Sequence, residues 1–498
     1  MARSVRRRIL VLLGTLVCLA VLFLVEEHVR GRVALAMYKH ELTSRGERLT
    51  PESLGLLPDK NWESKEAKAM AQAMKEISDL ELSMPFVKAV NETKEPGRQY
   101  ALLEQGKLSD YSKEITWEEF SHRLDAARPT LMKLREALRQ PTLSLKRDNE
   151  WITNRKVPVK HYSAINERQS AQWLNFLTLD AVRRGNMEEA VENIEMMAAM
   201  SRFQGNRDSL VACMIGVALE GLGVGTTWEV LQANGWNDAQ LARLQKAWET
   251  NDPLNDVVQA IEAERVRQES LMDRFGPTVK EKVRVGDGEP RKPLGYGNMA
   301  LVMLWRVAWA DQEKLEDFKS YQFSIEHARL IANHQWLRSR DMMKADSRTH
   351  GAWDQIRCVY TRLAPYGLVD GPDWLRAKER ILGTEMQRVE AIAAIALKRC
   401  QLKNGKYPET LDALVPDFLS KVPLDPVDGK PLRYHLKADG MFTLYSVGRN
   451  GTDEGGDPGP APTEGSGAFN DWRAWALDIT WPEPLHAEPP RLQDTKSR

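Results

Sequence analysis

The chain contains little cysteine and carries no net charge. Only four of its 498 residues are cysteines, and lysine plus arginine equal aspartate plus glutamate at 70 each. Cys18 lies inside an apolar run, and Cys213, Cys358 and Cys400 are far apart, so they do not resemble a disulfide framework. No Cys-x-x-Cys pair supports a zinc-ribbon or thioredoxin-like site. Because the balanced charge provides no basic field, we expect no nucleic-acid partner.

Common catalytic and phosphate-binding motifs are also missing. The sequence has no His-Glu-x-x-His, no Gly-x-Ser-x-Gly and no Walker sequence. Gly221 to Gly225 are rich in glycine, but they lack the spacing of a dinucleotide-binding loop and follow a helical pattern. We interpret them as a place where two helices pack closely. The sequence therefore names no catalytic residue.

What the chain does contain is an uncharged apolar run at its N-terminus. Ile9 to Val25 carry no charge, four arginines lie among the first eight residues, and Glu26 and Glu27 follow. A helix of this length covers about 25 Å, near the lower limit for crossing the hydrocarbon core of a bilayer. We therefore expect residues 9–25 to be a single transmembrane anchor in contact with membrane lipid.

The flanking charges predict the topology of this anchor. The arginine cluster favours a cytoplasmic N-terminus, so residues 1–8 should be a short basic cytoplasmic end and the bulk should be periplasmic or otherwise extracytoplasmic. A cleaved signal peptide is the alternative, but no small-x-small cleavage site follows the run. The expected location is the cell membrane.

Helical patterning dominates the middle of the chain, and we assign residues 29–372 to a helical extracytoplasmic region. Its clearest part is a helical hairpin over 166–203, which turns at Gly185. Residues 276–297 are rich in glycine, proline and charge, which indicates a linker or a long surface loop. The run Met299 to Ala310 is too short to span a membrane and contains Arg306, so we expect a buried helix.

After Asn404 the pattern changes to short strand-like pieces at 432–436 and 441–447, separated by proline, aspartate and glycine. The fold class is therefore mainly α, with a transmembrane helix, an α-helical middle and a small α+β unit over 373–481. The last residues, 482–498, are expected to be a disordered tail.

The C-terminal unit carries a resemblance in the order of its motifs. A long helix ends in Asn404-Gly405-Lys406-Tyr407-Pro408, and then come Pro423-Leu424-Asp425-Pro426, Leu432-Arg433-Tyr434 and Tyr445-Ser446-Val447-Gly448. This order resembles the C-terminal globular domain of type II secretion pseudopilins. The resemblance implies a helix packed on a small antiparallel sheet, and an acidic loop of the kind that often binds calcium.

The N-terminus departs from that family. A pseudopilin has glycine just before its apolar helix and glutamate early in it, whereas here Arg8 precedes Ile9 and the run contains no acid. This chain is therefore not expected to polymerise as a processed pilin. As a whole it resembles large membrane-anchored proteins of planctomycete-type bacteria, and that resemblance implies architecture only.

The acidic loop is the one candidate metal site. Asp453 and Asp457, together with Asp478 from the final strand, would supply the hard oxygen ligands that calcium takes. The alternative is a solvated turn, and Ala476 stands where the resemblance implies a further acid. A calcium ion here would be structural, holding a glycine-rich loop.

The sequence leads to two hypotheses about function. The first is a non-enzymatic interaction or scaffold protein of the envelope, whose partners belong to secretion or pilus-like assemblies. It rests on the anchor, the missing catalytic motifs and the pseudopilin-like end. The alternative is a periplasmic hydrolase with an unidentified active site, motivated only by the amount of folded chain. A cluster of acids in one pocket would favour the hydrolase.

Overall fold

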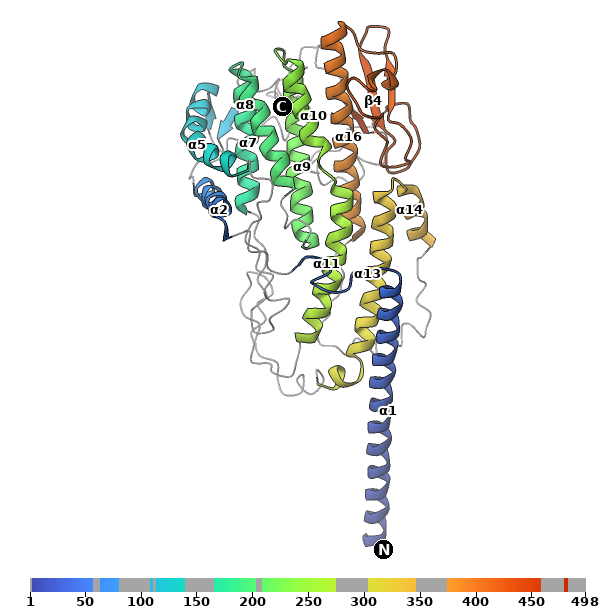
Figure 1. Ribbon diagram of the computed structural model, residues 1–498. Coiled ribbons are helices and arrows are strands. Elements are labelled where there is room, and N and C mark those ends of the chain that lie inside the picture. The colour runs from blue at the N-terminus through green and yellow to red at the C-terminus, as the bar shows by residue number, and fades with distance from the viewer. Residues whose placement is uncertain are drawn as a thin grey trace, which may run out of the picture.

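A computed structural model describes residues 2–56, 63–79, 108–110, 113–138, 165–202, 208–274, 303–345, 374–457 and 479–481. The mainly helical fold predicted from the sequence is confirmed (Figure 1). The predicted linker 276–297, the tail 482–498 and the predicted ligand Asp478 lie outside the described residues.

Helices form most of the body. They are α1 (Ala2–Ser44), α2 (Lys65–Ser78), α5 (Trp117–Leu138), α7 (Ile165–Arg183), α8 (Met187–Ser201), α9 (Leu210–Leu231), α10 (Asp238–Glu249), α11 (Pro253–Arg274), α13 (Ala310–Ala332), α14 (Trp336–Ala345) and α16 (Trp374–Asn404). The strands are β1 (Leu108–Asp110), β2 (Lys113–Ile115), β3 (Arg433–Leu436), β4 (Phe442–Ser446) and β5 (Ile479–Trp481).

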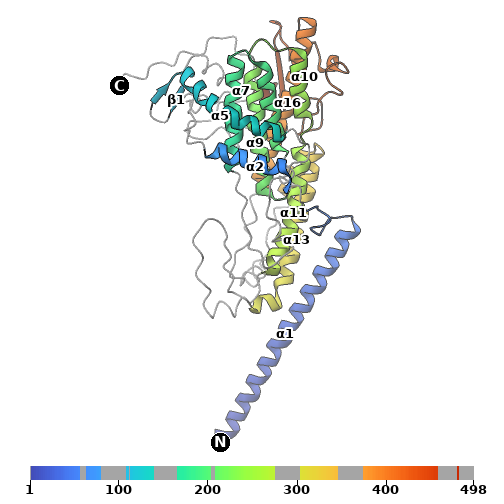
Figure 2. The same ribbon diagram turned by 60° about the vertical axis from the view of Figure 1, so that its left-hand side comes forward.

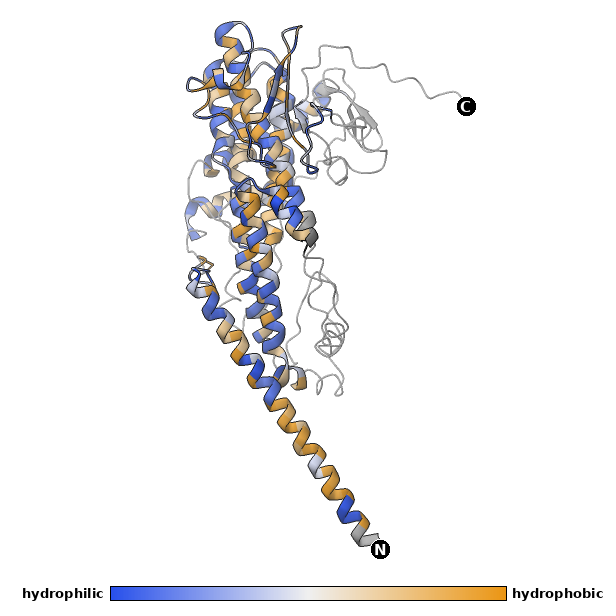
Figure 3. Cartoon of the chain, turned by 90° about the vertical axis from the view of Figure 1, so that its right-hand side faces the viewer, coloured by the Kyte–Doolittle hydropathy of each residue, from blue (hydrophilic) through white to orange (hydrophobic). Residues whose placement is uncertain are grey.

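α1 projects from one end of the body and contains the apolar run (Figures 1 and 2). It is long and apolar enough to span a membrane, and none of its most apolar 18-residue window is buried. α9 also passes the length and composition test, but 67% of its window is buried inside the body. The same apolar character therefore serves a core helix in α9 and leaves α1 without protein cover along its first half (Figure 3).

The predicted hairpin over 166–203 is confirmed by α7 and α8. Gly185 ends the turn after α7 with a φ of 74°, a backbone conformation that favours glycine. Asn186 then caps α8, because its side chain accepts a hydrogen bond from the Glu189 amide. α9 and α10 pack on this hairpin, and Asn237 starts α10 with a reciprocal capping box to Gln240.

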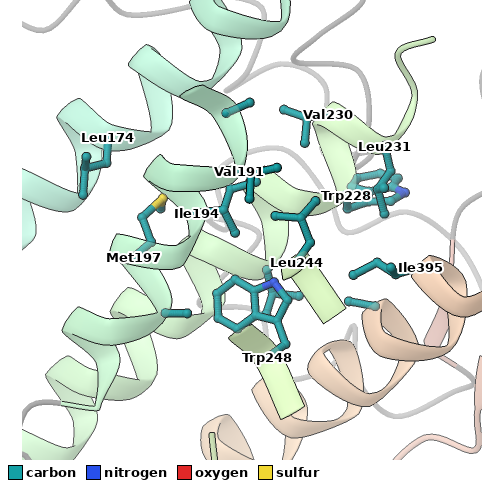
Figure 4. Packing of buried hydrophobic residues seen from close by; sticks show 14 of the residues in the cluster. Leu174, Val191, Ile194, Met197, Trp228, Val230, Leu231, Leu244, Trp248 and Ile395 are labelled. Atoms are coloured by element: carbon teal, nitrogen blue, oxygen red, sulfur yellow. The ribbon is translucent and has the colours of Figure 1, made fainter. Parts of the chain in front are cut away.

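The glycines of α9 include one close helix contact. A Cβ atom at Gly223 would lie 2.6 Å from Cη2 of Trp248 and 3.3 Å from Cβ of Met197. The Trp248 ring is fully buried and its Nε1 donates a hydrogen bond to Thr227 Oγ1 over 3.0 Å, so it has little room to move (Figure 4). The interpretation of this stretch as a helix-packing site is correct at Gly223.

Gly223→Ala is therefore expected to destabilise the protein by about 1–3 kcal/mol through overpacking. Gly225→Ala is the matched control, because it lies on the same helix and a Cβ there would meet nothing within 4 Å. The control should stabilise the helix by about 0.5–1 kcal/mol through its higher helix propensity. Chemical denaturation of both variants in detergent checks this, and equal effects would disprove the close contact.

A second layer is formed by α11, α13 and α14, with the N-terminal half of α16 packed beside them. Its apolar core combines residues of α9, α11, α13 and α16, including Cys213, Ile261, Ile325 and Met386. α1 runs along the outside of α13, parallel to it (Figure 1). α11 and α13 therefore connect the projecting helix to the rest of the body.

α16 packs against a three-stranded antiparallel sheet in the order β3-β4-β5, and the strand pieces predicted at 432–436 and 441–447 are confirmed by β3 and β4. Tyr407, at the end of the helix, packs its ring edge-on against Phe442 of β4, with 4.8 Å between centroids. Tyr434 Oη donates a hydrogen bond to the Pro408 carbonyl over 2.7 Å. These contacts fix the sheet on the C-terminal half of α16.

One hydrophobic core crosses the predicted domain boundary at residue 373. The cluster that contains Leu174 of α7 and Trp248 of α10 also contains Leu397 of α16 and Leu444 of β4. Gln245 of α10 adds a buried hydrogen bond to the Phe418 carbonyl over 2.8 Å. Since α16 contributes to both sides of this core, the helical region and the C-terminal unit share their packing.

Candidate functional site

Among the described residues, the junction between α1 and the body has an extensive set of hydrogen bonds and ion pairs outside the hydrophobic cores. At its lower end, Gln312 of α13 donates Nε2 to both the carbonyl and the carboxylate of Glu27, over 3.1 and 2.7 Å. Gly31 allows this approach, because a Cβ there would lie 2.8 Å from Gln312 Cγ. Leu35 and Leu42 continue the contact higher up, against Leu315 and Phe318.

Above these contacts, five charged side chains from three segments meet. Arg329 of α13 donates to Glu47, just beyond α1, over 2.5 Å and to Glu262 of α11 over 2.8 Å. Arg48 pairs with the other oxygen of Glu262. Arg265 of α11 donates to the Arg48 carbonyl over 3.0 Å and to Gln322 over 2.6 Å. We call this set, Glu47, Arg48, Glu262, Arg265 and Arg329, the junction network.

The junction network is largely removed from water. Arg265, Glu47 and Glu262 are buried, whereas Arg48 and Arg329 are partly exposed. Burial alone raises the pKa of Glu47, but the hydrogen bonds from Arg329 and Gln322 and the nearby arginine charges bring it below its usual value. Glu47 is therefore charged at neutral pH. Charges paired in this way hold their geometry, because separating them leaves a buried charge without compensation.

The base of the body contacts α1 close to the end of its apolar run. Leu24 packs against a cluster of Met272, Trp305, Ala308, Trp309 and Ala310, and His28 Nδ1 lies 2.7 Å from the Val307 carbonyl. The prediction that the run 299–310 forms a buried helix is wrong in part. Residues 299–302 lie outside the described residues, and residues 303–308 are helical, but Met303, Leu304 and Val307 are exposed while Trp305 and the following Trp309 are buried.

Two buried acids join the C-terminal sheet to α16. Asp425 accepts hydrogen bonds from the Val427 and Val447 amides, the Ser446 hydroxyl and Arg433. Glu390 of α16 accepts one from the Ser446 amide over 3.0 Å. Full burial, and then the nearby Asp425 charge, raise the pKa of Glu390 well above its usual value. Both carboxylates are closed off from solvent, which favours a structural role over catalysis.

A second buried ionic cluster lies where α9, α10 and α16 meet. Arg388 donates to both oxygens of Glu385 over 2.7 Å and to the Trp248 carbonyl over 2.6 Å. Glu220 of α9 lies 3.6 Å from Arg388 Nε, and burial raises the pKa of Glu220 to about 8. These side chains are also buried in the helical core.

An open hollow of about 400 Å³ lies between α5 and α7. It is lined by Glu118, Ser121, His122, Asp125, Arg183 and Arg184. The Ser121 hydroxyl donates to the buried Asp180, and Arg184 donates to Ser121 Oγ and to Asp125. Because the serine is bonded to aspartate and arginine, this hollow does not pair a nucleophile with a histidine base. Its lining includes two acids, Glu118 and Asp125, and the hydrolase alternative stays a prediction.

The structure describes two of the three predicted calcium ligands, Asp453 and Asp457. Asp453 Oδ1 accepts hydrogen bonds from the Tyr445 hydroxyl over 2.9 Å and the Gly455 amide over 3.0 Å, and Arg433 Nε lies 3.7 Å from Oδ2. Against the effect of burial, these groups hold the pKa of Asp453 below its usual value. Asp457 lies farther along the same loop, and Asp478 is outside the described residues. Within the part of the chain that is described, no group of three metal-binding side chains is found, and calcium stays a prediction.

Comparison with protein families, curated proteins and solved structures gives no match.

The junction network was not predicted from the sequence. Glu262 and Arg265 show only the ordinary spacing of neighbours on one helix face, and Glu47 and Arg48 follow a helix end. Glu47 and Arg329 are 282 residues apart in the chain. Their pairing depends on how α1 lies along α13, which no local pattern indicates.

Proposed function

We propose that this protein is a single-pass, membrane-anchored scaffold of the cell envelope, with a cytoplasmic N-terminus and its body on the extracytoplasmic side. The observation that carries the proposal is the junction network. A flexible tether would serve to keep a protein near a membrane, whereas buried ion pairs between the segment just beyond α1, α11 and α13 hold the body in one orientation. A fixed orientation suits a protein that presents a surface to other membrane-bound components.

We assign the protein contacts to the C-terminal unit. Its helix-and-sheet arrangement is compatible with the pseudopilin resemblance, and Leu436 at the end of β3 is exposed at its surface. The partners we propose are components of secretion or pilus-like assemblies. The shared core transmits the orientation of α1 to this unit, because α16 packs both on the sheet and on the helices of the body.

The test is site-specific photo-cross-linking in intact cells of the native host. A photoreactive amino acid at Leu436 should form discrete adducts with secretion or pilus-assembly proteins, identified by mass spectrometry. The matched control is Met132 on α5, which is also exposed but lies on another part of the body. Adducts with such proteins from position 436 alone support the proposal. Efficient cross-linking at 436 that yields only self-adducts, or the same adducts as 132, contradicts it.

A further inference from the structure

Three apolar side chains at the base of the body point away from the protein. Met303, Leu304 and Val307 are 43%, 36% and 56% exposed, although they belong to a short helical segment whose other face is well packed. We call these three residues the basal patch. Exposed apolar side chains that are grouped on one short segment indicate a surface with a partner.

The basal patch lies at a known height relative to the apolar run. Leu24, the second-last residue of the run, packs against the cluster under the patch, and His28 contacts the Val307 carbonyl. His28 is three residues beyond Val25, which is a rise of about 4.5 Å along the helix. The headgroup layer on each side of the hydrocarbon core is about 5–7 Å thick. If residues 9–25 cross the bilayer, the patch is therefore at its surface.

The side chains next to the basal patch are arranged as expected for a helix at the surface of a bilayer. Trp305 and Trp309 form the packed side of the segment, and Trp305 Nε1 donates a hydrogen bond to Glu313 over 2.5 Å. Arg306 donates to the Asp273 carbonyl over 3.4 Å, so its charge is on the protein side. A short helix with apolar side chains outward and a basic side chain on its other face has the amphipathic arrangement of an interfacial helix.

We propose that the basal patch is a second membrane contact, inserted into the interfacial layer of the bilayer leaflet from which α1 emerges. The proposal rests on the proposed function, because it requires α1 to span the membrane. Lipid is the occupant that the position favours, since α1 and the patch are joined at the level where α1 leaves the apolar run (Figures 1 and 3). Two contacts with the bilayer, α1 and the basal patch, restrict the tilt of the body relative to the membrane and its rotation about the α1 axis.

The experiment places an environment-sensitive fluorescent amino acid at Val307 in the full-length protein, reconstituted in phosphatidylcholine vesicles that contain lipids with a nitroxide at a shallow acyl position. Leu22, 64% exposed within the apolar run, reports insertion of the anchor. Leu402, 45% exposed near the far end of α16, is the control for the solvated body. Nitroxide quenching and quenching by aqueous iodide are measured at each position.

We expect nitroxide quenching at 307 and 22 to exceed that at 402 several-fold, with iodide quenching in the opposite order. Strong quenching by lipid at 22 with free access of iodide at 307 overturns the second contact and leaves the anchor intact. A label at 307 that neither quencher reaches also overturns it, because protein then covers the patch. Lipid quenching at neither 22 nor 307 overturns both the anchor and the contact.

Discussion

Replacing Arg265 with alanine is expected to lower the free energy of unfolding by about 3–5 kcal/mol, because it breaks a buried ionic network from within. The Arg265 side chain is 0% exposed and bonds Gln322, the Arg48 carbonyl and, at 3.5 Å, Glu47. Its loss takes a donor from the Gln322 side-chain oxygen and from the Arg48 carbonyl, and takes a nearby positive charge from Glu47, which keeps its bonds to Arg329. Denaturant unfolding of the full-length protein in detergent measures the change.

The matched control is Arg45→Ala. Arg45 also pairs with a glutamate near the end of α1, Glu41, but its side chain is 57% exposed. An exposed pair of this kind contributes about 0–1 kcal/mol. Hydrogen exchange adds a local measurement, since the amides at the C-terminal end of α1 should exchange faster in Arg265→Ala and unchanged in Arg45→Ala. Similar unfolding free energies for the two variants would refute the role assigned to the junction network.

Asp425→Ala is expected to be equally severe, with a loss of about 3–5 kcal/mol, because it leaves several buried donors without their acceptor, each at a cost of about 1–3 kcal/mol. The carboxylate accepts hydrogen bonds from the Val427 and Val447 amides, the Ser446 hydroxyl and Arg433, the last over 2.7 Å. The two amides and the hydroxyl lose this acceptor together, whereas Arg433 keeps its ion pair with Asp428 over 2.6 Å. Since Ser446 also donates its amide to Glu390, the change should loosen the sheet on α16.

Asp439→Ala is the control for this variant. Asp439 lies in the turn between β3 and β4, is exposed, and accepts one hydrogen bond, from the Met441 amide over 2.9 Å. Its removal should cost no more than about 1 kcal/mol. Thermal unfolding followed by tryptophan fluorescence compares the two. If Asp425→Ala and Asp439→Ala have the same melting temperature, the buried carboxylate does not hold the sheet in place.

The shared core makes these two sites parts of one mechanical unit. The junction network fixes the segment just beyond α1 to α11 and α13, the core of α9, α10 and α16 continues from them, and Glu390 of α16 bonds the end of β4. A rotation of α1 is thereby a rotation of the C-terminal unit. This continuity is the physical basis for proposing a scaffold of fixed orientation.

Several features of the fold were predictable because they depend on local sequence. The apolar run of residues 9–25 needs only its own composition to form an exposed apolar helix, and the hairpin around Gly185 needs only helical periodicity and a residue that tolerates positive φ. The strands β3 and β4 follow from alternation and turn residues over a dozen positions. In each case the determining residues are neighbours in the chain.

The sequence by itself therefore determined the apolar helix, the helical body and the strand pairing near the C-terminus. Only the tertiary structure decided which apolar residues are covered. Residues 299–310 and α9 are both apolar, yet α9 is enclosed by other helices while Met303, Leu304 and Val307 are exposed beside α1. It also decided the charge pairing of Glu47 with Arg329, which are 282 residues apart. The physical reason is that burial and ion pairing depend on which segments meet in space, and segments hundreds of residues apart leave no local pattern of that meeting.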